Sequence, residues 1–247
     1  MAQLDNRYAQ SGTAARAGAA VDEGLRAYML GVYNYMAAGV ALTGIVAYVT
    51  YTMAVSNGAL TPFGQMLYTS PLRWVIMLAP LGFVLFMSFR VQKMSVGAAQ
   101  ISFWLFAALM GLSLSSIFLV FTGQSITQIF FITAAAFGGL SLWGYTTKKD
   151  LSGWGSFLVM GVVGIIIAAL VNLFLQSGAL QFAISVIGVL VFAGLTAYDT
   201  QRIKDGYLMV RHDTAMVAKS AIMGALSLYL DFINMFLFLL QLFGNRQ

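Results

Sequence analysis

The stretch that decides the fold is AIMGALSLYLDFINMFLFLLQLFG, residues 221–244. It is long enough to cross a bilayer as a helix, which takes about 20 apolar residues, yet it carries Asp231 near its middle. An aspartate at mid-bilayer costs roughly 2.5–3.5 kcal/mol on insertion scales, so it is expected to face a bundle interior or a water-filled path. Residues three or four positions apart share one face of a helix, so most of the polar residues here lie on one stripe with Asp231. This stripe comprises Gly224, Ser227, Asp231, Asn234, Phe238 and Gln241.

The composition indicates an integral membrane protein. The chain is 60% hydrophobic and 9% charged, whereas ordinary soluble domains carry about 25% charged residues. It has no cysteine, which excludes disulfides and cysteine-based metal sites. The net charge of +5 is interpreted as a signal of topology and not of nucleic-acid binding.

Apolar runs of membrane-spanning length predict an all-α fold of seven helices, residues 28–53, 71–90, 97–121, 125–146, 154–176, 179–201 and 220–243. Residues 26–247 form this transmembrane domain, and the small, polar residues 1–25 are expected to be a disordered cytoplasmic tail. The polar stretch SNGALTPFGQMLYTSPLR, residues 56–73, is predicted to be a loop in which Pro62 and Pro71 act as helix breakers.

Basic residues orient the predicted spans. Eleven of the 13 fall on the side of the N-terminus: Arg7, Arg16, Arg26, Arg90, Lys93, Lys148, Lys149, Arg202, Lys204, Arg211 and Lys219. Arg73 and Arg246 alone lie on the other side. The positive-inside rule therefore predicts a cytoplasmic N-terminus and an external C-terminus.

Two of the eight acidic residues, Asp199 and Asp231, fall in or at the edge of a span. Their helices are consecutive and antiparallel, so the two carboxylates are candidates for a pair that shares one proton, because like charges at close range do not both ionise cheaply. Once that proton leaves, two carboxylates offer oxygen ligands of the kind that Ca²⁺ accepts. Ser227 and Asn234 would line the same polar stripe.

A simpler interpretation of Asp199 is an interfacial residue paired with Arg202, three positions later. The expected depths also differ: Asp231 lies about 18 Å of helix beyond Lys219, whereas Asp199 lies about 5 Å from Arg202. The two aspartates meet only if the last helix begins well before Lys219, or if a cytoplasmic funnel reaches inward.

Four segments resemble the Bax inhibitor-1 family, in particular its bacterial members: GLSLSSIF (111–118), ITAAAFGGLSLWGYTTKKDLSGWGSFL (132–158), GLTAYDTQRIK (194–204) and ALSLYLDFINMFLFLLQLFG (225–244). The resemblance implies a bacterial inner-membrane protein of seven helices, the last surrounded by the other six. It also implies a pH-sensitive Ca²⁺ leak governed by Asp199 and Asp231. A gating arginine, a latch at the end of the second helix, would correspond to Arg90.

The leading hypothesis is therefore a proton-regulated cation leak channel, without enzymatic activity or a tightly bound cofactor, whose ligands are protons and Ca²⁺ and whose surroundings are lipid. A regulator that binds a membrane-bound ATP-dependent protease is an alternative, since some relatives in the resembling family act in this way. Intramembrane aspartyl proteolysis is a remote alternative. Proteases of that class carry Gly-x-Gly before the second aspartate and a Pro-Ala-Leu element after it, whereas here Leu-Tyr-Leu precedes Asp231 and no proline follows Pro80.

Overall fold

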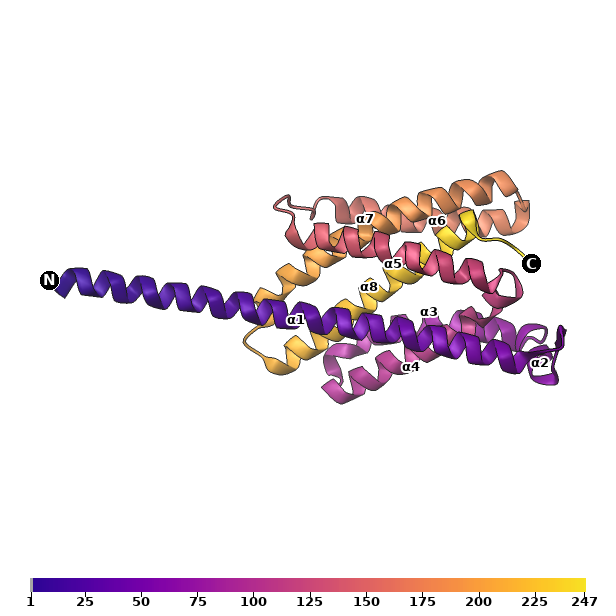
Figure 1. Cartoon of the computed structure of the whole chain (residues 1–247), viewed down its shortest axis with the longest axis horizontal. Coiled ribbons are helices and arrows are strands. Elements are labelled where there is room, and N and C mark those ends of the chain that lie inside the picture. The colour runs from indigo at the N-terminus through magenta and orange to yellow at the C-terminus, as the bar shows by residue number, and fades with distance from the viewer. Residues whose placement is uncertain (1) are drawn as a thin grey trace.

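A computed structural model gives the structure of residues 2–247, with side chains described for residues 21–247. Within that part of the chain, seven helices are long and apolar enough to cross a membrane, which confirms the predicted number of spans. They are α1 (Ala2–Ala54), α3 (Leu72–Arg90), α4 (Val96–Leu114), α5 (Gly123–Thr146), α6 (Trp154–Leu175), α7 (Gly178–Val210) and α8 (Thr214–Phe243). Figure 1 shows these helices running roughly lengthwise in one bundle. Short 3₁₀ turns follow α3 and α4, at Val91–Lys93 and Ser115–Leu119.

Short polar side chains fix where several helices begin. Ser95, Thr122 and Ser177 each accept a hydrogen bond from a backbone N–H of the first turn of α4, α5 and α7. At the start of α8, the Asp213 carboxylate accepts two such bonds, from Ala215 and Met216. These caps satisfy N–H groups that have no partner within the helix, so they set the ends of the hairpins.

The connection between the first two spans is more ordered than the predicted loop. Strands β1 (Val55–Ser56) and β2 (Ala59–Leu60) form a hairpin through Asn57 and Gly58, which both have positive φ, as the tightest hairpin turns require. Helix α2 (Pro62–Tyr68) follows. Pro62 starts this helix instead of breaking one, because a proline in the first turn lacks only an N–H that would have no partner.

The first helix has no boundary at residue 25, since α1 continues through residues 21–25. The predicted tail lies mostly outside the residues whose side chains are described, and its disorder and cytoplasmic location stay predictions there.

Helix α8 is the most buried of the seven. It packs against α7, α1, α5 and α4, while α3 packs mainly on α4 and α6 on α7. Two thirds of its most apolar window is buried, compared with one third or less in every other helix. Its fully buried Tyr229 donates a hydrogen bond to Thr43 of α1, whose own hydroxyl donates to the carbonyl of Ala107 in α4. Three helices are therefore tied together at one buried point.

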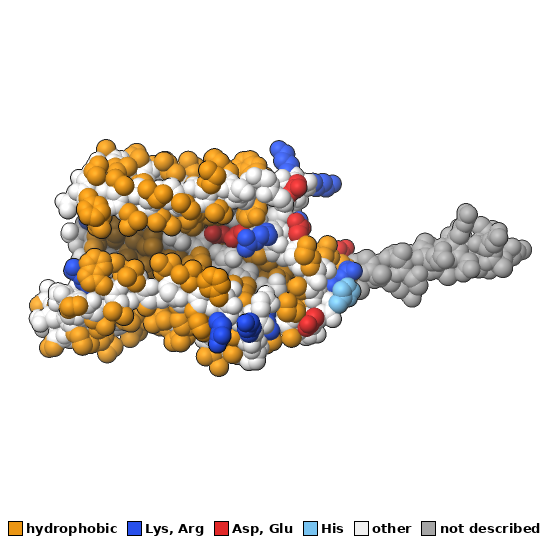
Figure 2. Space-filling view, turned by 180° about the vertical axis from the view of Figure 1, so that it is seen from behind, with side chains coloured by type: hydrophobic (Ala, Val, Ile, Leu, Met, Phe, Trp, Pro, Cys, Tyr) orange, Lys and Arg blue, Asp and Glu red, His pale blue; other side chains and the backbone are white. Residues whose placement is uncertain are grey.

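The face of the bundle in Figure 2 is apolar over most of its length. Helix α6 exposes an almost unbroken hydrophobic face that includes Phe157, Met160, Ile166, Leu173 and Phe174. Such a face has no favourable partner in water and suits the hydrocarbon of a bilayer.

Candidate functional site

The interface between α7 and α8, here called the α7–α8 seam, brings the two membrane aspartates together. Gly224 of α8 packs against Ile203 of α7, and farther along the seam Phe238 stacks on Phe192 with ring centroids 5.9 Å apart. Asp199 lies between the two α7 contacts in sequence, and Asp231 lies between the two α8 contacts. Antiparallel packing in this register places Asp199 and Asp231 at about the same level of the seam.

The lengths of α7 and α8 explain how Asp199 and Asp231 reach the same depth, although the sequence predicted different depths for them. Helix α7 has 33 residues and α8 has 30, which correspond to about 50 and 45 Å, whereas the hydrocarbon core of a bilayer is about 30 Å thick. Helix α8 begins at Thr214, before Lys219, and α7 continues to Val210, beyond Asp199. Both helices therefore project past the core at their shared turn, and the condition for a meeting of the aspartates is fulfilled.

Asp199 is buried, with only 8% of the residue exposed, and forms an ion pair with Arg202. Arg202 Nη1 lies 3.5 Å from Asp199 Oδ1, and the arginine side chain is 58% exposed. The interfacial pair considered from the sequence is thus present, but its acidic member is inside the protein. The Asp199–Arg202 contact is the one ion pair among residues 21–247. Figure 2 shows acidic and basic side chains side by side in a groove between the two halves of the bundle.

Asp231 is 4% exposed, and its Oδ2 has no hydrogen-bond partner among the residues whose side chains are described. It is the sole buried side-chain oxygen or nitrogen in that part of the chain without one. Leaving such an atom unsatisfied costs about 1–3 kcal/mol, and more when the group is charged. The atom therefore offers a binding position for a proton, a water molecule or a cation.

The remaining polar residues of the α8 stripe lie along the same seam or close to it. Gln241 accepts hydrogen bonds from Ser185 and Gln181 of α7, and these three residues line a cavity of about 370 Å³ near the C-terminal end of α8. Asn234 donates to the carbonyl of Leu230 in its own helix, and Ser227 is half-buried. The stacked rings of Phe192 and Phe238 separate this polar cavity from the aspartates.

Arg90 is exposed at the end of α3 and forms no ion pair within residues 21–247. The latch role of Arg90 therefore stays a prediction, and Arg202 is the arginine that pairs with Asp199. A further residue was not identified from the sequence: buried Gln201 accepts from Leu151 N–H and donates to the carbonyl of Lys149, each at 2.8 Å. The sequence around Gln201 does not indicate that its side chain binds the α5–α6 loop, because that loop lies about 50 residues earlier in the chain.

Gln201 thereby fixes the α5–α6 loop against α7. In that loop, hydrogen bonds from Ser152 hold the pKa of the exposed Asp150 carboxyl below its ordinary value. No group of three or more His, Cys, Asp or Glu residues suited to a metal ion occurs in the described part of the chain. Any cation at the seam would meet two carboxylates and complete its shell with carbonyl oxygens or water.

Comparison with known proteins gives the family. Residues 25–247 match the family described as "Inhibitor of apoptosis-promoting Bax1". The chain belongs to the Bax inhibitor family. Family membership covers the whole transmembrane domain, so the resemblance read from the four sequence segments is confirmed.

Similar proteins include several from bacteria. The chain is 47% identical to the inner membrane protein YbhL of Escherichia coli, covering 91% of this chain and 94% of the relative. It is also 47% identical to an uncharacterised protein of Caulobacter vibrioides, with both chains fully covered. An uncharacterised membrane protein of Streptococcus pyogenes is 35% identical over 91% of this chain and 95% of its own length. With seven membrane-spanning helices, this family member is a multi-pass inner membrane protein.

Proposed function

We propose that this chain is a proton-regulated cation leak channel of the inner membrane, with Ca²⁺ as a permeant ion and the Asp199–Asp231 pair as its regulatory site. The single observation that carries the proposal is the buried Oδ2 of Asp231, which has no partner among the described residues. At about the same level of the seam, Asp199 carries a second carboxylate, which is paired with Arg202. A site kept only for stability gains nothing from this arrangement, because an unpaired buried carboxylate destabilises the fold. A site that exchanges protons or cations needs it.

The proposed path follows the α7–α8 seam. At one end it begins at the polar cavity around Gln181 and Gln241, meets the stacked Phe192 and Phe238, and then reaches the aspartates. Arg202, more than half exposed, marks the other end. The stacked rings form an apolar segment of this path, where a barrier to hydrated ions is expected.

The carboxylates fit a transient cation better than a resident one. Ca²⁺ takes six to eight oxygen ligands at 2.3–2.6 Å, and the protein supplies two carboxylates here, with an arginine competing for one of them. Weak coordination suits permeation, because an ion that binds too tightly does not leave. Ca²⁺ is therefore proposed as cargo, with no bound cofactor and no enzymatic role for the pair.

The proposal includes a topology in which α8 is the central helix, the N-terminus is cytoplasmic and the C-terminus is external. The buried packing of α8 against α7, α1, α5 and α4 supports its central place. Basic residues of the α3–α4, α5–α6 and α7–α8 connections support the orientation, since the positive-inside rule assigns their side to the cytoplasm. Figure 2 shows most blue side chains toward one end of the bundle.

Proteoliposomes that contain a Ca²⁺-sensitive dye test the proposal. Wild-type protein should raise Ca²⁺ entry above that of empty liposomes, with a rate that differs between pH 6 and pH 8. Asp199→Asn and Asp231→Asn should each change the rate or remove its pH dependence. Asp205→Asn is the matched control, because Asp205 lies exposed on the same helix as Asp199. Flux that is the same in all three variants and the wild type would reject the channel and favour a role as a binding regulator.

A further inference from the structure

A second cavity lies between α1 and α5, and neither aspartate of the α7–α8 seam is in its lining. It has a volume of about 560 Å³, within the range of pockets that bind small molecules. Its walls are mostly apolar and come from both helices: Met29, Leu30, Met36, Ala37, Phe137 and Leu142. The channel proposed above makes no use of this space.

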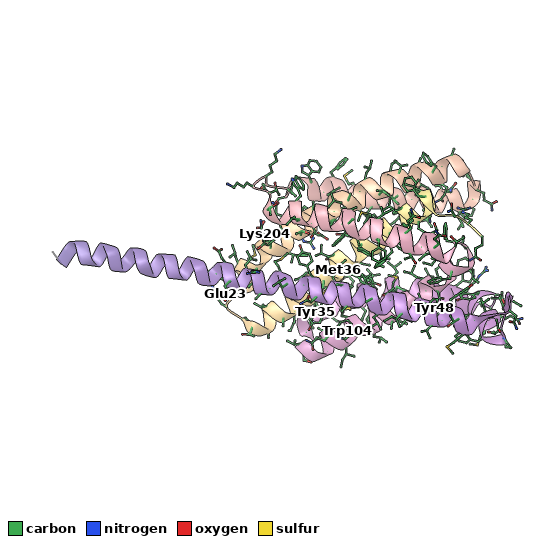
Figure 3. All side chains as sticks on the ribbon, viewed as in Figure 1. Glu23, Tyr35, Met36, Tyr48, Trp104 and Lys204 are labelled. Carbon is green, nitrogen blue, oxygen red and sulfur yellow. The ribbon has the colours of Figure 1, made fainter. Side chains whose placement is uncertain are left out.

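One end of the α1–α5 cavity is basic. Exposed Arg26 lines it together with Tyr145, and Lys204 of α7 donates a hydrogen bond to the Tyr145 carbonyl at 2.9 Å. No acidic residue lines the cavity, and Glu23, one turn before Arg26, makes no ion pair within the described residues. Figure 3 shows Glu23 and Lys204 toward the same end of the bundle, with Met36 farther along α1.

The inner wall is closed by hydroxyl groups that satisfy one another. Tyr33 of α1 lies 2.6 Å from the Ser141 hydroxyl of α5, which in turn lies 2.9 Å from the Thr200 hydroxyl of α7. Thr200 donates onward to the carbonyl of Thr196. This wall therefore has little unused hydrogen-bonding capacity for a polar ligand, and the free charge of the cavity is at the Arg26 end.

The length of the cavity matches one leaflet of a membrane. From Arg26 to Ala37, α1 rises about 16 Å at 1.5 Å per residue, and half of a hydrocarbon core is about 15 Å. A ligand that fits both the charge and the length has an anionic head and a hydrocarbon chain. Basic pockets between transmembrane helices are known sites for anionic lipid headgroups.

We propose that the α1–α5 cavity binds one anionic phospholipid, with the phosphate beside Arg26 and an acyl chain along the groove toward Ala37 and Phe137. A lipid is the occupant because the apolar walls offer an acyl chain more contact than they offer a water-soluble anion. The positive charge of the site comes from one exposed arginine, Arg26, with Lys204 near the same end. The lipid headgroup therefore adds selectivity, whereas most of the affinity comes from burial of the acyl chain.

Gly138 provides the test. It lines the cavity, and a Cβ at this position would meet nothing within 4 Å, so a larger side chain can start here without a backbone clash and occupy part of the groove. Gly139 is the matched control: it is the next residue of α5, its Cβ would be equally free, and it does not line the cavity. Arg26→Gln removes the charge, and Lys93→Gln, at an exposed position in the α3–α4 connection, is its control.

The delipidated protein in detergent is titrated with phosphatidylglycerol or with phosphatidylcholine of the same acyl chains, and bound lipids are counted by native mass spectrometry. Wild type, Gly139→Leu and Lys93→Gln should retain one phosphatidylglycerol in preference to phosphatidylcholine. Gly138→Leu should lose that lipid. Arg26→Gln should weaken phosphatidylglycerol binding about fivefold and leave phosphatidylcholine unchanged, because one basic residue near an anionic headgroup contributes on that scale.

Free glycerol phosphate should not displace the bound lipid; displacement would show that the site recognises a soluble phosphate instead. Equal retention of the two lipids by wild type, or equal lipid loss in Gly138→Leu and Gly139→Leu, overturns the proposal. If Gly138→Leu does not fold, as judged by thermal unfolding, the comparison of Arg26→Gln with Lys93→Gln decides the question alone.

Discussion

Replacing Asp231 with asparagine keeps the size of the side chain and exchanges an ionisable carboxyl for an amide that is neutral at every pH. In the wild type, Oδ2 of this residue has no hydrogen-bond partner among the described residues, a state that costs about 1–3 kcal/mol or more. The amide group of asparagine can donate to the neighbouring Asp199 carboxylate, and a hydrogen bond to a charged group is worth about 1.5–3 kcal/mol. We therefore expect the free energy of unfolding at pH 8 to rise by about 1–3 kcal/mol.

For a chain of this length, each kcal/mol corresponds to a Tm increase of about 2–4 °C. Thermal unfolding of the purified protein in detergent, followed by tryptophan fluorescence, measures this shift, and the same preparations enter the liposome flux assay. Asp205→Asn should change stability by no more than about 0.5 kcal/mol, as is usual for an exposed position. The expected combination in Asp231→Asn is a more stable protein with altered flux, because functional sites commonly sacrifice stability. A less stable Asp231→Asn protein with unchanged flux would refute the reasoning.

Three further perturbations test the seam and the packing around it. Phe238→Ala, which removes one of the stacked rings, should raise basal Ca²⁺ flux, whereas Phe243→Ala, on an exposed side chain of the same helix, should leave it unchanged. Tyr229→Phe removes one buried hydrogen bond and should lower the free energy of unfolding by about 0.5–1.5 kcal/mol; no measurable loss of Tm would show that this bond does not hold α8 in place. Gly144→Ala should destabilise the α5–α7 contact, because its Cβ would collide with the backbone of Ala197, while Gly139→Ala should be tolerated; equal Tm values would contradict the close approach.

Several features of the site could be read from residue spacing. The cost of placing a carboxylate in hydrocarbon singled out Asp231, and helical periodicity placed Gln241 on the same stripe. The contact between Asp199 and Arg202 could also be predicted from the sequence, since residues three apart share a helical face. Arg90 shows the limit of such reasoning: arginines at helix ends are commonly positive-inside anchors, so its position alone does not indicate a latch. In the structure it is exposed and makes no ion pair with the described residues.

The sequence by itself determined that the chain crosses a membrane seven times, because hydrophobicity and the length of a helix are local properties. It also determined that two aspartates belong to consecutive antiparallel helices. Only the tertiary structure decided the register of α7 against α8, which depends on contacts such as Gly224 with Ile203 that no local pattern encodes. The unpaired oxygen of Asp231, the loop held by Gln201 and the cavity between α1 and α5 were decided in the same way, since each depends on which distant side chains fill the surrounding space.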